Sequence, residues 1–201
     1  MSWTRCIVRF LVIVLLVVNV VAIDSAVASE CPADGSRSFA LEKAGVRTEY
    51  RPMEQAIVRL DETIGRATFT HYLFRGLIEV YREGKKGITL SIPLTDLESV
   101  FPLEEGKKHS LKLISMNPKD MKESEQLLEL EVTGREEIRL RNCTYAVLAV
   151  HHCRENAAGR VLDCWTSLYS PDLRAVLAKR YDEGTVHETT IAYRGIEALP
   201  D

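Results

Sequence analysis

The chain has 201 residues, of which 46% are hydrophobic and 27% charged, and its 26 Lys and Arg against 29 Asp and Glu give a formal net charge of −3. Because the charges are nearly balanced and dispersed, there is no electrostatic reason to expect nucleic acid or an anionic membrane surface as a partner. The length suits one domain that can bury a substantial hydrophobic core.

The N-terminus predicts a secretory signal peptide over residues 1–28. Arg5 and Arg9 precede an apolar run from Phe10 to Ile23, and Ala26-Val27-Ala28 is a small-residue cleavage site of the A-x-A kind. The alternative, an uncleaved membrane anchor, is disfavoured because a helix over this run rises only about 21 Å, short of a hydrocarbon core of about 30 Å. We therefore expect an exported protein, periplasmic or extracellular, that does not span the membrane after cleavage.

The remaining chain divides into a lead-in and one body. Residues 29–45 are polar and weakly periodic, whereas short segments rich in β-branched and aromatic residues recur throughout residues 46–201. Glycines or short polar stretches punctuate the series. The predicted strands are residues 66–74, 77–81, 87–92, 127–133, 137–140, 144–150, 161–169, 175–181 and 186–193.

Helical signals are few. Residues 93–100 predict a short helix, because Pro93 suits an early helical position and Leu94, Leu97 and Val100 are spaced for one face. Residues 117–128 predict a second short helical stretch. The fold class expected is therefore mostly β: a single-domain curved antiparallel meander, a half-barrel or a sandwich, with one or two short helices.

Four cysteines follow the signal segment, and an even number in an exported chain favours disulfides. A tight turn centred on Ala158-Gly159 places Cys153 directly opposite Cys164, at a Cβ separation close to what a disulfide needs. Cys31 then pairs with Cys143 and ties the lead-in to the body. The spacing thus predicts the bridges Cys153–Cys164 and Cys31–Cys143.

A metal centre around His151, His152 and Cys153 is the alternative for this region. Strand alternation places His151 and Cys153 on one face and His152 on the other. Two ligands on one face do not make a zinc site, and the sequence has no C-x-x-C or H-x-x-x-H spacing to supply the others. We therefore expect neither a metal nor a cofactor.

Two motifs carry a resemblance to a known family. Phe101–Lys107 (FPLEEGK) is similar to the F-P-L-x-x-G-K turn of a family of uncharacterised secreted bacterial domains, and Trp165–Leu177 (WTSLYSPDLRAVL) is similar to its W-x-x-x-Y-S-P-x-L segment. Arg141-Asn142-Cys143 departs from the family, which has Pro-Ala-Gly there. The resemblance covers about half of the mature chain, residues 101–196. It implies a curved antiparallel sheet of periplasmic type, somewhat like the lipoprotein-localisation factors, without catalytic residues or a particular ligand.

Signals for catalysis are weak. The sequence has no G-x-S-x-G elbow, and Ser170 precedes Pro171 as turn residues commonly do. The adjacent carboxylates Glu136 and Glu137 face opposite sides of a strand and cannot share a substrate. We expect no catalytic residues and no enzymatic activity.

Aromatic residues on the predicted strands are candidates for the lining of a ligand cavity, although such residues are more often plain core. They are Trp165, Tyr145, Tyr169 and Tyr193.

Two classes of function therefore fit the sequence. The first is a binder or carrier that holds a lipid or another hydrophobic ligand of the cell envelope against the concave face of the sheet. The second is an envelope protein-interaction module with a fully packed core, whose partner is another protein. A hydrolase is a more distant third. An enclosed apolar pocket of several hundred Å³ favours the carrier, whereas a filled core with an exposed apolar patch favours the interaction module.

Overall fold

The computed structural model describes residues 31–85 and 87–200, so the predicted signal peptide lies outside the described residues. Within them, thirteen strands form one antiparallel sheet in the order β12-β11-β10-β9-β8-β7-β6-β5-β4-β3-β2-β1-β13. The strands are β1 (Phe39–Lys43), β2 (Val46–Pro52), β3 (Ile57–Ile64), β4 (Ala67–Phe74), β5 (Ile78–Gly84), β6 (Gly87–Pro93), β7 (Lys108–Asn117), β8 (Lys122–Leu140), β9 (Cys143–Asn156), β10 (Val161–Ser170), β11 (Ala175–Tyr181), β12 (Thr189–Ala192) and β13 (Gly195–Ala198).

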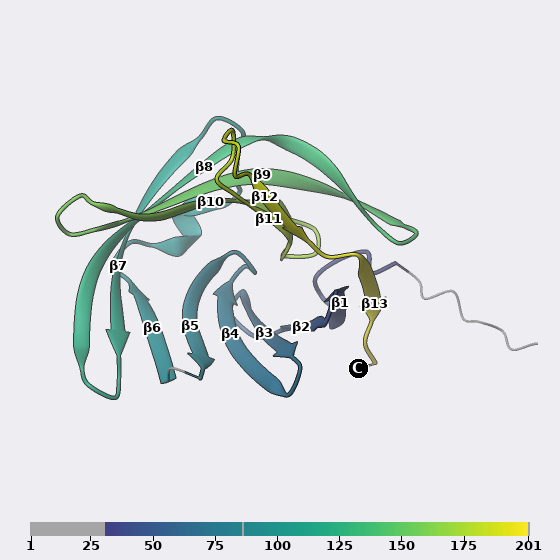
Figure 1. The fold of residues 1–201 in the computed structure, drawn as a ribbon, viewed down its shortest axis with the longest axis horizontal. Coiled ribbons are helices and arrows are strands. Elements are labelled where there is room, and N and C mark those ends of the chain that lie inside the picture. Colours follow the sequence, from purple (N-terminus) through teal and green to yellow (C-terminus); the bar gives the residue numbers. More distant parts are fainter. Residues whose placement is uncertain (1–30, 86, 201) are drawn as a thin grey trace, which may run out of the picture.

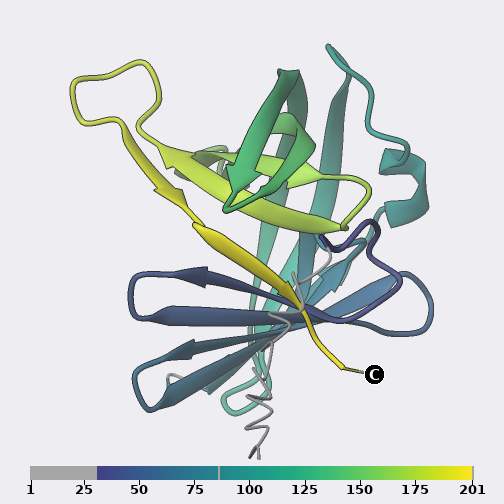
Figure 2. The ribbon, with the colours of Figure 1, turned by 90° about the vertical axis from the view of Figure 1, so that its right-hand side faces the viewer.

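The sheet is a meander that curls strongly, which confirms the predicted fold class. Strands β8, β9 and β10 arch over β2 to β5 (Figure 1), and in the turned view the blue strands run across the picture whereas the teal strand β7 is upright (Figure 2). The sheet is not closed, although two consecutive residues bond to β11 and β1, the strands next to its two edges. The N–H of Tyr193 donates to the Leu177 carbonyl at 3.1 Å, and the N–H of Arg194 donates to the Glu42 carbonyl at 2.7 Å.

The middle of strand β9, residues 147–150, is buried on both faces and separates two apolar clusters. Alternate residues of a strand face opposite sides, so Val147 packs in the first cluster and Leu148 in the second. A register shift between Val132 and Gly134 bends the long strand β8 against β9. Before this bulge β8 contributes to the second cluster, and after it Leu140 contributes to the first. The core is therefore filled on both sides of the sheet.

The helical predictions are only partly met. Residues 93–100 hold a single 3-10 turn, η1 (Leu97–Val100), which Asp96 caps by accepting from the N–H of Glu98 at 3.0 Å. The second helical prediction, residues 117–128, was wrong, because this segment is the β7–β8 hairpin. Asn117 Oδ1 and Asp120 Oδ1 accept from backbone N–H groups two residues on, at 2.9 and 3.2 Å. Such bonds favour a turn over a helix.

The sheet also begins earlier than the sequence indicates, within the expected lead-in of residues 29–45. Strand β1 lies between β2 and β13, and Phe39, Ala40 and Leu41 are fully buried. Phe39 stacks on Tyr50 with ring centroids 5.0 Å apart. A strand buried on both faces has no polar–apolar alternation, so the hydrophobic periodicity of the sequence does not identify it.

No helix in residues 31–85 or 87–200 is long and apolar enough to cross a membrane.

Candidate functional site

A pocket of about 260 Å³ opens where three connections meet at one end of the curled sheet. The connections are the β4–β5 turn, the segment after η1 and the β10–β11 corner. We call it the arginine pocket, because two arginines stand among otherwise apolar or aromatic residues. Its lining consists of Arg75, Phe101, Pro102, Leu103, Leu148, Tyr169, Pro171 and Arg174.

Close contact between two turns builds this pocket. Gly76 has φ of +71°, and a Cβ at this position would lie 1.6 Å from the Arg174 carbonyl oxygen. Arg75 and Arg174 themselves adopt positive φ, 48° and 50°. Few residues other than Gly adopt this backbone conformation, and it persists only where the surrounding structure imposes it. The Tyr169 hydroxyl donates to the Arg75 carbonyl at 2.7 Å and joins the β4–β5 turn to the end of β10.

The two arginines differ in how they are held. Arg75 pairs with Glu98 at 2.5 Å, its guanidinium lies 5.1 Å from the Phe101 ring centroid, and its buried Nε has no hydrogen-bond partner among the described residues. Arg174 is exposed and forms no ion pair with any described residue. Burial raises the pKa of Tyr169 well above its ordinary value, against the opposing effect of both arginines. The pocket therefore presents positive charge and a neutral hydroxyl above an apolar floor.

The predicted cavity-lining aromatic residues do not surround one cavity. Of the four, only Tyr169 lines the arginine pocket. Trp165 packs against the second apolar cluster and its indole N–H donates to Ser167 Oγ at 3.2 Å. Tyr145 and Tyr193 belong to the first cluster, where the Tyr193 hydroxyl bonds Thr48 Oγ1 at 2.8 Å. Trp165, Tyr145 and Tyr193 therefore pack in or against the apolar core and do not line a cavity together.

Both predicted disulfides are confirmed. Cys31 is joined to Cys143 with a Cα–Cα distance of 5.7 Å, and Cys153 to Cys164 with 4.2 Å. Cys153 and Cys164 are direct register partners in β9 and β10, as the turn-counting argument requires. Disulfides are typical of exported proteins, since oxidising compartments preserve them.

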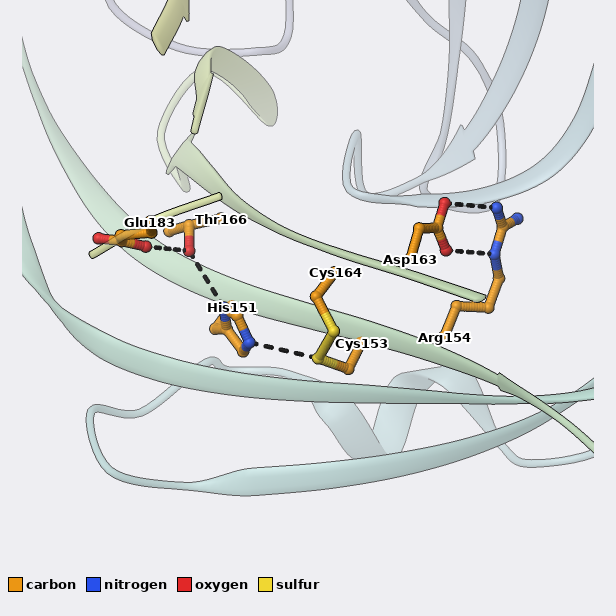
Figure 3. Close-up of a disulfide and its surroundings, with 7 residues drawn as sticks. All are labelled: His151, Cys153, Arg154, Asp163, Cys164, Thr166 and Glu183. Carbon is orange, nitrogen blue, oxygen red and sulfur yellow. Dashed lines mark hydrogen bonds and ion pairs between the residues drawn. A yellow bond between two sulfur atoms is a disulfide. The ribbon is translucent and has the colours of Figure 1, made fainter. Parts of the chain in front are cut away.

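Residues around the hairpin disulfide form a connected polar group that sequence reasoning missed (Figure 3). His151 Nε2 lies 3.3 Å from Cys153 Sγ, and His151 Nδ1 lies 3.2 Å from Thr166 Oγ1. Thr166 in turn donates to Glu183 Oε2 at 2.6 Å. The sequence places His151 and Cys153 on one face and Cys164 opposite Cys153, and the pairing of β9 with β10 adds Thr166 opposite His151.

His152 points to the opposite face of β9 and has a measurable consequence for stability. It is 2% exposed, stacks on Trp165 at 4.8 Å, and burial, helped by Lys179 and His151, lowers its pKa to about 3. The folded protein thus keeps this imidazole neutral, whereas the unfolded chain takes up a proton near pH 6.5. The stability that depends on neutral His152 is present above about pH 6.5 and is lost as the pH falls toward 3.

We expect the His152→Gln variant to lose less stability on acidification than the wild type does. Between pH 7.5 and 4.5 the difference should be about 2–3 kcal/mol, measured by urea denaturation at each pH. His187→Gln is the control, because His187 is exposed. An equal loss in wild type and His152→Gln would show that His152 is protonated in the folded protein.

Comparisons with known proteins add little. No protein-family model matches the chain, and no curated protein matches it. Among solved structures, the hypothetical lipoprotein YmcC from Escherichia coli K12 is similar, with a TM-score of 0.49 and 10% sequence identity over 82% of this chain and 83% of that chain. The family resemblance drawn from the two sequence motifs stays a prediction.

Proposed function

We propose that the protein is a non-enzymatic binding protein of the cell envelope that holds the acidic end of a lipid or another amphiphile in the arginine pocket. The observation that carries this proposal is the combination of an apolar floor with two guanidinium groups. Arginine recognises carboxylates and phosphates with fixed hydrogen-bond geometry, and apolar side chains favour an attached hydrocarbon. Export to the periplasm is part of the proposal, supported by the two disulfides.

The size of the pocket limits what it can hold. Its volume of about 260 Å³ lies just below the range of about 300–1,000 Å³ that is common for small-molecule sites. The buried residues of its lining, Leu103, Leu148 and Tyr169, belong to the second apolar cluster. The pocket therefore suits the polar end and first carbons of an amphiphile rather than a whole lipid.

The test compares dodecanoate with dodecanol, which share a chain and differ in charge, by isothermal titration calorimetry. We expect dodecanoate to bind and Arg174→Gln to raise its dissociation constant about 10-fold to 100-fold, the range expected for a lost charge-assisted hydrogen bond. Arg75→Gln should act in the same direction. Arg66→Gln is the matched control, since Arg66 is exposed in the β3–β4 turn.

Either of two results would contradict the proposal. Equal binding of dodecanol and dodecanoate would show that the arginines do not select an acidic group. Binding of neither probe would favour the alternative, an envelope protein-interaction module.

The alternative function has one specific observation in its favour. Strand β12 (Thr189–Ala192) lies at the end of the sheet order and all four of its residues are exposed. An edge strand offers unpaired backbone groups to a strand of another protein. Native mass spectrometry of protein purified from its own envelope separates the two roles, because a co-purifying small ligand supports the binder and a stoichiometric protein partner supports the module.

A further inference from the structure

Three metal-ligating side chains converge on the face of β9 and β10 that carries the hairpin disulfide (Figure 3). His151 and Cys153 are two residues apart in β9, and Cys164 opposes Cys153 in β10. The ligand atoms of the three residues all lie within 4.8 Å of one another. This cluster is separate from the residues of the arginine pocket, so it does not depend on the function proposed above.

No hydrogen-bond donor among the described residues reaches one ring nitrogen of His151. Thr166 Oγ1 gives its proton to Glu183 Oε2 at 2.6 Å, so it accepts from His151 Nδ1 at 3.2 Å. In the neutral imidazole the lone pair is then on Nε2, which faces Cys153 Sγ at 3.3 Å. A disulfide sulfur has no proton to donate, so the Nε2 lone pair accepts no hydrogen bond from the described residues of the oxidised protein.

The same hydrogen-bonded chain is typical of a metal-binding histidine. Such histidines usually donate their second ring N–H to a polar group, which fixes the tautomer and the orientation of the ring. Here Thr166 is that group, and it is itself 1% exposed and held by Glu183. His151 is thus already oriented with Nε2 toward the two sulfurs.

We propose that reduction of the Cys153–Cys164 disulfide creates a zinc site with His151 Nε2 and the two thiolates as ligands. Zinc binds thiolate at about 2.3 Å and imidazole at about 2.0–2.1 Å in tetrahedral geometry, which places two bound sulfurs about 3.8 Å apart. Covalently joined sulfurs cannot adopt that separation, so the site is absent from the oxidised protein. The fourth position is left to water, as in open zinc sites.

Carboxylates and cations both lie around the cluster, and Arg180, the register partner of Thr166, pairs with Glu136 and Glu183. Glu129 and Glu131 of β8 are the register partners of Cys153 and His151 and lie on the same face of the sheet. Glu131 forms an ion pair with Lys108 at 2.9 Å, whereas Glu129 is exposed and forms no ion pair with a described residue.

The chemistry of the switch balances with a dithiol as reductant. The dithiol supplies two electrons and two protons, becomes a disulfide itself and leaves Cys153 and Cys164 as thiols. Zinc binding then releases the two thiol protons to solvent. Affinity for zinc is therefore coupled to the redox state of this one disulfide.

The experiment uses a chain whose only cysteines are Cys153 and Cys164, obtained with Cys6→Ser, Cys31→Ser and Cys143→Ser. The folded protein, checked by circular dichroism, is reduced with a dithiol, freed of it under anaerobic conditions and titrated with Zn²⁺ or Co²⁺. We expect one equivalent to bind only after reduction, with a thiolate-to-cobalt charge-transfer band. If this variant does not fold, reduced wild type compared with Cys153→Ser/Cys164→Ser answers the same question.

Further variants separate a ligand from a positioning residue. His151→Gln should weaken zinc binding at least about 100-fold, and Thr166→Val about 10-fold, with recovery in Thr166→Ser. The control His187→Gln should bind as the unmodified protein does. Equal zinc affinity of the oxidised and reduced forms, or of His151→Gln and its parent, would overturn the proposal.

Discussion

Replacing Cys31 and Cys143 together by serine is expected to lower the free energy of unfolding by about 4–5 kcal/mol. The bridge closes a loop with a sequence separation of 112 residues, and the entropy that a crosslink removes from the unfolded chain grows with loop length. The Cys153–Cys164 bridge spans only 11 residues, so its removal should cost about 2–3 kcal/mol. Urea denaturation of the two double variants measures both values.

The ranking of the two variants is the informative result. If the hairpin variant loses more stability than the Cys31 variant, the crosslinks do not act mainly through the unfolded chain. Reduced wild type should remain folded, because a domain of this size can bury an adequate core without crosslinks. Loss of the β signal in the circular dichroism spectrum of the reduced protein would contradict that expectation.

The substitution Gly76→Ala is expected to cost about 3 kcal/mol or more. The residue has φ of +71°, which strains any residue with a Cβ, and the added carbon would meet the Arg174 carbonyl oxygen at 1.6 Å. The two turns that form the arginine pocket would have to separate. Thermal or urea denaturation measures the loss, and binding of dodecanoate should weaken in the same variant.

Gly45→Ala is the matched control for this prediction. Gly45 has the same φ of +71°, yet no atom of the described residues lies within 4 Å of the position of its Cβ. It should therefore lose only the conformational part, about 1–2 kcal/mol. Equal losses at Gly45 and Gly76 would mean that the β4–β5 turn and the β10–β11 corner do not press on each other.

Most strands and the hairpin disulfide could be predicted because their signals are local. Polar and apolar residues alternate where one face of a strand is buried, and glycines mark the turns between strands. The pairing of Cys153 with Cys164 follows from counting outward from one turn, since the two strands of a hairpin are held in register by it. A bulge in the register between Val161 and Asp163 leaves that pairing intact.

Other features could not be predicted from the sequence, because burial on both faces or side-chain hydrogen bonds replaced the expected pattern. Strand β1 is buried on both faces and so lacks alternation. Residues 117–128 resemble a helix in composition, but Asn117 and Asp120 hold the backbone in a turn. Of the four aromatic residues expected around one cavity, Trp165 and Tyr169 of β10 pack in or against the second cluster, whereas Tyr145 and Tyr193 pack in or against the first.

By itself, the sequence determined the β class, the antiparallel meander and both disulfides, because these depend on periodicity, turn residues and the number of cysteines. Only the tertiary structure decided where function can be sought. The arginine pocket combines Arg75, Phe101 and Arg174, which are far apart in the chain and meet through the curl of the sheet. The group around His151 needs Glu183, which follows β11 and lies beyond the β9–β10 hairpin. No local pattern encodes such meetings, since they arise from strand pairing and curvature over the whole sheet.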